Sequence, residues 1–126
     1  MTASSTTSLT RPRITSPTDC FIGGEWVPSV SDARFDVVDP ATGEVIATVA
    51  DGGIADAEKA LAAAVDSAAE WAATAPRVRS DILRTAYEMI MARSEELAAI
   101  ITAEMGKPLA DARGEVAYGA EFFRWF

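Results

Sequence analysis

The sequence predicts an α/β protein in which a few short strands come first and four helices follow. Between residues 20 and 50, short apolar segments rich in strand-forming residues alternate with turn signals such as Gly23-Gly24. After Gly52-Gly53 the apolar residues recur at the spacing of a helix. Because the 126 residues are 49% hydrophobic and 24% charged, we expect one globular domain rather than a disordered chain.

The strands are expected to form a small β unit with tight turns. Phe21-Ile22 and Glu25-Trp26-Val27 flank the first glycine pair, and paired glycines accept the positive φ angles that a two-residue hairpin requires. Two further strands are expected at residues 35–38 and 45–49. The segment Asp39-Pro40-Ala41-Thr42-Gly43 between them has the composition of a turn.

The first two expected helices have recognisable starts. The first follows Gly53 and is rich in alanine, with Asp56 and Glu58 near its positive end. The second begins at Pro76, and Thr74 is its predicted N-cap.

The third helix is predicted from Glu95 to Glu104, with Ser94 as its cap. Gly106 is expected to end this helix by adopting the left-handed conformation. Pro108 is expected to open the fourth helix. One stripe of that helix is predicted to be buried, namely Leu109, Ala112, Val116, Gly119 and Phe123.

The end of the fourth helix is dense in aromatic residues that cannot all lie on one side: Tyr118, Phe122, Phe123, Trp125 and Phe126. A helix that is apolar nearly all round is expected to be buried on most sides. Each large aromatic left exposed forgoes roughly 2–3 kcal/mol of burial. We therefore expect further polypeptide to cover this helix, so that the chain is incomplete beyond Phe126.

Composition excludes several classes of function. The formal net charge of −8 disfavours binding to nucleic acid, and no apolar run approaches the length of a membrane span. Residues 1–19 are expected to be a disordered leader without a secretory signal, and residues 20–126 the folded part. The single cysteine cannot form an internal disulfide, which favours a cytoplasmic location. The absence of histidine removes the usual general base near neutral pH.

In order along the chain, the segments resemble the N-terminal region of the aldehyde dehydrogenase superfamily. The matching segments are 21–26, 39–44, the alanine-rich helix ending at Trp71, 82–84, and Glu104-Met105-Gly106-Lys107-Pro108-Leu109 followed by 112–116 and 122–126. The last block, from Gly-Lys-Pro-Leu to Trp-Phe, looks most like the succinate-semialdehyde dehydrogenase branch. The resemblance covers about residues 20 to 126.

The resemblance implies that this chain is part of a Rossmann-like cofactor domain in a longer enzyme, which is a homo-oligomer. In that enzyme a cysteine thiolate attacks a small aldehyde, hydride passes to NAD or NADP, and water hydrolyses the resulting thioester. The family's cofactor segments and its nucleophile lie further along than Phe126. We therefore expect no catalytic residue in this chain, no turnover by it alone, and no tight binding of NAD or NADP.

The candidate site residues of this chain have simple structural interpretations. Cys20 is expected to be an incidental thiol, because the chain has no histidine to deprotonate it and no helix N-terminus is predicted beside it. Gly23-Gly24 and Gly52-Gly53 do not fit the strand, Gly-x-Gly-x-x-Gly, helix pattern of a phosphate loop and are expected to be turns. Lys107 is expected to reach the carbonyls at the end of the third helix.

One functional site can be carried over from the resemblance. Some relatives bind a monovalent cation through carbonyls of the strand before the Asp-Pro turn and through an acidic residue just before Gly-Lys. The matching positions here are Val37, Val38 and Glu104. Oxygen ligands suit such an ion, and a further ligand would come from sequence that follows this chain.

Two other interpretations stay open. The chain could be a non-catalytic helical interaction protein derived from an aldehyde dehydrogenase, which binds a partner through its aromatic C-terminal helix. It could also be the product of a decayed gene.

Overall fold

The computed structural model describes residues 16–126, in which four short strands precede four helices, as the sequence predicts. The first 15 residues, which make up most of the expected leader, lie outside the described residues. Of the leader's last residues, Thr18 accepts a hydrogen bond from the backbone N–H of Ala50 (2.8 Å), and Asp19 pairs with Arg34 (2.7 Å).

The strands form two separate antiparallel hairpins. β1 (Cys20–Ile22) pairs with β2 (Glu25–Val27). The two residues between them, Gly23 and Gly24, have φ angles of 63° and 89°, which confirms the predicted glycine turn. β3 (Arg34–Val38) pairs with β4 (Val45–Ala50), and their register shifts between Val37 and Val38.

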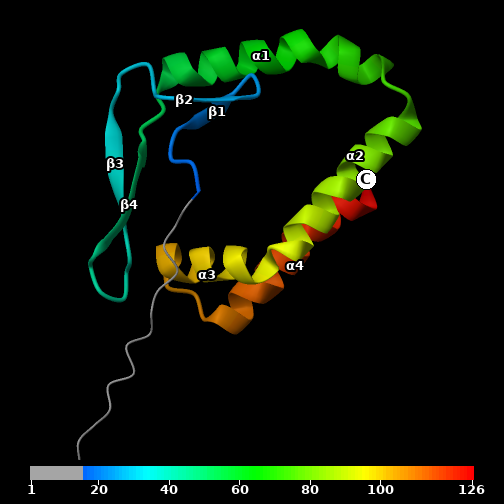
Figure 1. Ribbon diagram of the computed structural model, residues 1–126. Coiled ribbons are helices and arrows are strands. Elements are labelled where there is room, and N and C mark those ends of the chain that lie inside the picture. Colours follow the sequence, from blue (N-terminus) through cyan, green and yellow to red (C-terminus); the bar gives the residue numbers. More distant parts are fainter. Residues whose placement is uncertain (1–15) are drawn as a thin grey trace, which may run out of the picture.

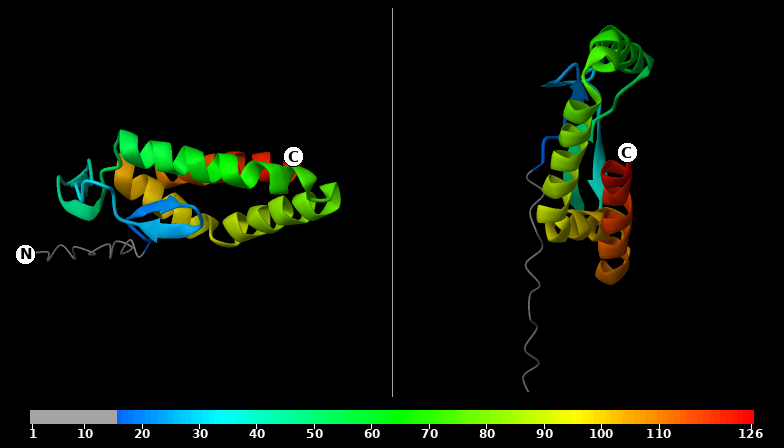
Figure 2. Two further views of the ribbon diagram at one scale, coloured as in Figure 1. Left: turned by 90° about the horizontal axis from the view of Figure 1, so that it is seen from above. Right: turned by 90° about the vertical axis from the view of Figure 1, so that its right-hand side faces the viewer.

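The helices are α1 (Ile54–Ala73), α2 (Pro76–Ala92), α3 (Ser94–Met105) and α4 (Leu109–Trp125). They trace an open outline in which α1 and α3 occupy opposite edges, and α2 runs between them (Figure 1). α4 turns back from the end of α3 and packs against both α2 and α3 (Figures 1 and 2). None of the helices in the described part of the chain is long and apolar enough to cross a membrane.

α1 is fixed at its start by a buried carboxylate. Asp56 is only 6% exposed and accepts hydrogen bonds from the backbone N–H groups of Gly53 and Val30, each at 2.9 Å. The first bond satisfies an N–H that the helix leaves unpaired, and the second joins α1 to the loop after β2. These two bonds, the Gly53 bond above all, lower the pKa of Asp56 below its ordinary value of 3.8.

The two predicted helix caps are wrong. The Thr74 hydroxyl donates to the Glu70 carbonyl (2.9 Å), so Thr74 ends α1 rather than capping α2. Ser94 is the first residue of α3, not its cap. Only Arg93 separates α2 from α3, and its N–H still bonds back to the Ile90 carbonyl (3.1 Å).

The described residues bury few apolar side chains, and those are small. The buried hydrophobic residues are Ala98, Ala112, Val116 and Ala120, with Ile90, Leu97 and Ile101 partly buried around them. No large side chain in residues 16–126 is fully buried. The core therefore consists of close contacts among α2, α3 and α4 at small residues.

The predicted buried stripe of α4 needs correction. Ala112 and Val116 are buried as expected, and Ala120 continues the line. The other predicted positions are exposed, namely Leu109 (38%), Gly119 and Phe123 (41%). The buried line follows a spacing of four residues, as expected for a narrow seam between packed helices. The larger aromatic side chains are left outside this seam.

Candidate functional site

The residues predicted to hold a cation lie at the ends of β3 and α3. Val37 is half-buried and Val38 is 44% exposed, at the position where the β3–β4 register shifts. Glu104 is exposed in the last turn of α3. In residues 16–126, no group of three or more His, Cys, Asp or Glu side chains could hold a metal ion. A site here would therefore depend on carbonyl oxygens together with one carboxylate.

The structure brings the two segments that carry these residues next to each other. A Cβ atom added to Gly106, directly after α3, would lie 3.0 Å from Cγ of Pro40, which follows β3. The turn at Pro40 is held by Asp39, which is 3% exposed and whose Oδ1 accepts the N–H of Ala41 (2.7 Å). The Gly43 N–H closes the turn onto the Asp39 carbonyl (2.8 Å). The position of the β3 end is thus defined by hydrogen bonds within the turn.

Lys107 does not reach the carbonyls of α3, contrary to the prediction. Its Nζ lies 2.6 Å from a carboxylate oxygen of Glu115 on α4. Gly106 has the expected left-handed φ of 73°, and its own N–H satisfies the Thr102 carbonyl (2.9 Å). Because the chain changes direction at Gly106, the lysine side chain extends toward α4.

The glycine pair before α1 stands between a strand and a helix, which is the setting of many phosphate sites. Gly53 is the N-cap of α1. However, the carboxylate of Asp56 already occupies this helix end, where it accepts the Gly53 N–H (2.9 Å). A second anion there would be repelled by this charge, so the geometry does not favour phosphate binding.

Cys20, the only cysteine of the chain, is half-buried in β1. A Cβ atom added to Gly52 would lie 3.4 Å from its sulfur, so the thiol packs against the backbone at the start of α1. The interpretation of Cys20 as an incidental thiol stays a prediction.

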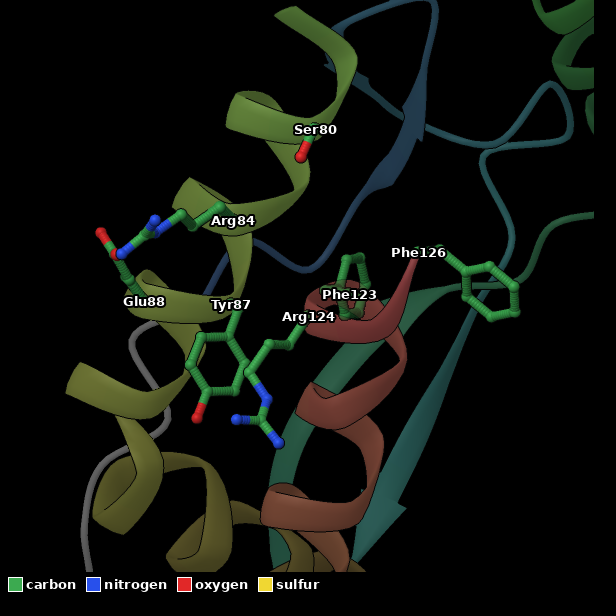
Figure 3. Close-up of a pocket in the computed structure, with 7 residues that line it drawn as sticks. All are labelled: Ser80, Arg84, Tyr87, Glu88, Phe123, Arg124 and Phe126. Atoms are coloured by element: carbon green, nitrogen blue, oxygen red, sulfur yellow. The ribbon is translucent and has the colours of Figure 1, made fainter. Parts of the chain in front are cut away.

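A hollow with a volume of about 310 Å³, not predicted from the sequence, lies between α2 and α4 (Figure 3). Its lining residues are Ser80, Arg84, Tyr87, Glu88, Phe123, Arg124 and Phe126. The signals in the sequence are the arginines of α2 and the aromatic residues at the end of α4. Because the two helices are far apart in sequence, their pairing had to come from the fold.

Both arginines of this hollow already have acidic partners. Arg84 donates to Glu88 (3.1 Å), and Arg124 donates to Glu121 (2.8 Å) while it lies 5.7 Å from the Tyr87 ring centre. The carboxylate of Glu121, followed by the smaller contribution of Tyr87, raises the pKa of Arg124. Figure 3 shows the Arg84 side chain directed toward Glu88. These pairings leave little positive charge for an anionic ligand.

The outer side of α4 carries a second hollow, lined by Tyr118, Glu121, Phe122, Trp125 and Phe126. We call the four aromatic residues of this set the aromatic face. Their exposed fractions are 69%, 50%, 83% and 80% in that order, and the Tyr118 and Phe122 rings meet edge to face at 5.2 Å. So much exposed aromatic surface is typical of an interaction surface.

Comparisons with known proteins assign this fold to a family. The sequence profile of the aldehyde dehydrogenase family matches residues 26–126. Among curated relatives, the chain is 58% identical over 82 residues to a succinate-semialdehyde dehydrogenase of Paenarthrobacter nicotinovorans, which covers 65% of this chain and 18% of the relative. It is 45% identical over 108 residues to the mitochondrial succinate-semialdehyde dehydrogenase of Rattus norvegicus, which covers 86% of this chain and 20% of the relative.

Solved structures give the same result. The succinate-semialdehyde dehydrogenase of Burkholderia pseudomallei is 47% identical, with a TM-score of 0.80 over 83% of this chain and 22% of that one. An NADP-dependent enzyme of E. coli is 34% identical, with a TM-score of 0.83. The match covers 86% of this chain and 22% of the E. coli chain. An NAD-dependent aldehyde dehydrogenase of Sinorhizobium meliloti is 35% identical, with a TM-score of 0.81. The match covers 90% of this chain and 23% of that enzyme's chain.

The chain belongs to the aldehyde dehydrogenase family, whose members act on aldehydes and depend on NAD or NADP. Within that family it is similar to the succinate-semialdehyde dehydrogenases, as the sequence resemblance predicted. It spans about a fifth of the length of the curated relatives that it matches.

Proposed function

We propose that this chain is the N-terminal part of an NAD(P)-dependent aldehyde dehydrogenase that oxidises a small carboxylate-bearing aldehyde, succinate semialdehyde, to the acid. The observation that carries this proposal is the 45% identity to a succinate-semialdehyde dehydrogenase over 86% of the chain. The likeness extends to the fold, with a TM-score of 0.80 to a solved enzyme of that name. In this role the chain contributes the opening portion of a Rossmann-like cofactor domain.

The contribution of this chain is structural. NAD or NADP would accept the hydride from the aldehyde in the complete enzyme. Small-residue packing positions α2, α3 and α4, and the Asp39 turn shapes the β3–β4 hairpin. The Asp56 cap fixes the start of α1 against the loop after β2. Because the chain has no histidine and its one cysteine packs in β1, we assign no reacting group to it.

The coding sequence after codon 126 tests the assignment. We expect it to continue in frame, or after one frameshift, into a Pro-Trp-Asn segment and later a cysteine. The protein made from this longer frame should reduce NAD or NADP faster with succinate semialdehyde than with an aldehyde of equal length that lacks the carboxylate. An unrelated downstream sequence, or equal rates with the two aldehydes, would count against the proposal.

The chain on its own should be inactive and should bind NAD or NADP only weakly. A fluorescence titration with each cofactor measures the binding, and the absorbance of the reduced cofactor measures turnover with succinate semialdehyde. We expect no saturation at low micromolar cofactor and no turnover. Saturable binding in that range would contradict the assignment of a purely structural role.

We also propose that the carbonyls of Val37 and Val38 and the carboxylate of Glu104 contribute to a monovalent cation site. The contact of Gly106 with Pro40 supports this placement, because it brings the ends of α3 and β3 together. Sodium or potassium chloride should raise the thermal midpoint of the longer protein more than choline chloride does. Glu104→Gln should abolish this difference, whereas Glu58→Gln, an exposed change on α1, should leave it intact.

A further inference from the structure

The turn between β3 and β4 fixes the direction of one candidate cation ligand, the Val38 carbonyl. The Asp39 N–H donates to the Glu44 carbonyl on the other side of the turn (2.9 Å). The Val38 C=O belongs to the same peptide unit as this N–H. No peptide bond in residues 16–126 is cis, and in a trans peptide the C=O and the N–H point in opposite directions. The Val38 carbonyl therefore points away from Glu44 and out of the hairpin, which suits a ligand to an ion outside it.

A close contact holds the end of α3 beside this turn (Figure 1). Pro40 lies two residues after Val38, and Gly106 lies two residues after Glu104. A Cβ atom added to Gly106 would lie 3.0 Å from Cγ of Pro40 and 3.9 Å from its Cβ. Carbon atoms in favourable contact are about 3.5–4.0 Å apart, so the proline ring leaves no room for a side chain here. Glycine therefore allows a closer approach of the two segments than any other residue would.

We propose that the contact between Gly106 and Pro40 is a spacer that sets the ion size of the cation site, in favour of sodium over the larger potassium ion. The inference rests on the cation site proposed above, to which Val38 and Glu104 contribute. Cavity size and the rigidity of the oxygen ligands decide between ions of equal charge. The hydrogen bonds within the turn at Asp39 make it rigid, so a displacement of Pro40 moves the Val38 carbonyl with it.

A side chain at position 106 should widen the site. Gly106→Ala places a methyl group against the Pro40 ring, so one of the two segments must move by a few tenths of an ångström. We expect the affinity for sodium to fall several-fold relative to that for potassium. Gly106→Asn adds the same Cβ with less backbone strain, because asparagine tolerates the left-handed conformation, and should shift the ratio in the same direction. Gly114→Ala adds a methyl group in open space on α4 and should leave the ratio unchanged.

The test measures thermal midpoints of the longer protein in increasing sodium or potassium chloride, with choline chloride keeping the ionic strength constant. The rise of the midpoint with ion concentration gives an apparent affinity for each ion. The ratio of the two affinities is compared within each variant, so that a general loss of stability cancels. Equal affinities in the wild type, or one ratio shared by the wild type and both Gly106 variants, would overturn the spacer and leave the cation site in place. A wild type that responds to neither ion would overturn the cation site itself, and the spacer with it.

Removal of the proline ring separates the spacing of the two segments from backbone strain. Pro40→Ala deletes Cγ, so the nearest remaining atom of residue 40 lies 3.9 Å from a Cβ at position 106. In the Pro40→Ala background, Gly106→Ala should no longer change the ratio of sodium to potassium affinity, although its left-handed strain remains. If Gly106→Ala changes the ratio equally with proline or alanine at position 40, the spacer is overturned.

Discussion

The guanidinium of Arg113 on α4 donates hydrogen bonds from Nε and Nη2 to the two carboxylate oxygens of Glu95 on α3, each at 2.8 Å. The pair joins residues 18 positions apart and lies beside the buried contact of Ala98 and Ala112. The hydrogen bonds from Arg113 hold the pKa of Glu95 below its ordinary value of 4.5. In turn, Glu95 raises the pKa of Arg113, so the guanidinium stays charged wherever the carboxylate titrates.

The Glu95 pair predicts a small loss of stability in acid. A carboxyl whose folded pKa is depressed contributes fully above its unfolded pKa, here 4.5, and the contribution disappears as the pH falls through the lower folded value. Both side chains are at least half exposed, so the effect should be modest and weaker at high salt. Thermal melts of the wild type and Arg113→Ala should differ at neutral pH and converge well below pH 4.5. A difference that persists in acid would rule out this origin.

Asp56 predicts a second acid-sensitive contact, at lower pH and at the other end of the molecule. Its ordinary pKa of 3.8 is lowered mainly by the Gly53 N–H and then by the Val30 N–H, so its stabilisation is complete above 3.8 and is lost as the pH falls through the folded value. Asp56→Ala leaves both N–H groups without this acceptor and should lower the midpoint of the far-UV circular dichroism melting curve, as the loss of a helix cap does. Glu58→Ala, an exposed change in the same helix turn, is the control and should shift it little.

The close approach of α3 and α4 predicts that this seam does not accept a larger side chain. Ala112 is fully buried against the cluster that contains Ala98 and Val116. Ala112→Leu should destabilise the helices by about 1–3 kcal/mol through overpacking. Ala110→Leu adds the same atoms at an exposed position of α4 and should be nearly neutral. Urea titrations followed by far-UV circular dichroism measure the unfolding midpoint of each variant. Equal midpoints for the two variants would contradict the packing of this seam.

The turn between α3 and α4 depends on a glycine. Gly106 has φ of 73°, and a Cβ atom there would lie 3.0 Å from Cγ of Pro40. Gly106→Ala should therefore cost about 1–2 kcal/mol from the left-handed backbone, and crowding by Pro40 adds to this. Gly114→Ala, inside α4 with open space around it, should instead stabilise by about 1 kcal/mol. Both substitutions add one methyl group. If they shift the thermal midpoint in opposite directions, the difference comes from backbone strain and not from side-chain size.

The sequence predicted the element order and most boundaries because these depend on local signals. Gly23-Gly24, Gly106 and the switch from strand to helix spacing after Gly53 act through backbone conformation alone. The predicted cap at Thr74 was wrong because its hydroxyl bonds to the Glu70 carbonyl of the preceding helix. The predicted cap at Ser94 was wrong by one position, because α3 already begins at this residue.

Features that depend on tertiary contacts could not be predicted in the same way. Lys107 pairs with Glu115 because α4 turns back along α3. The spacing of residues in the sequence does not predict the direction in which α4 leaves that turn. The choice of Ala120 over Gly119 for the buried seam depends on how the helices cross. For the cation residues, sequence supplied the candidates Val38 and Glu104, whereas the contact of Gly106 with Pro40 required the fold.

The central claim is that residues 16–126 leave their large apolar side chains without partners among themselves. Thermal unfolding of the purified chain tests this claim most directly. It is followed by near- and far-UV circular dichroism and by binding of an apolar dye. A segment with a small alanine-rich core and uncovered apolar faces should be helical, bind the dye at low temperature and melt gradually without a sharp near-UV transition. A monomer that excludes the dye and unfolds in one sharp transition seen by both signals would contradict it.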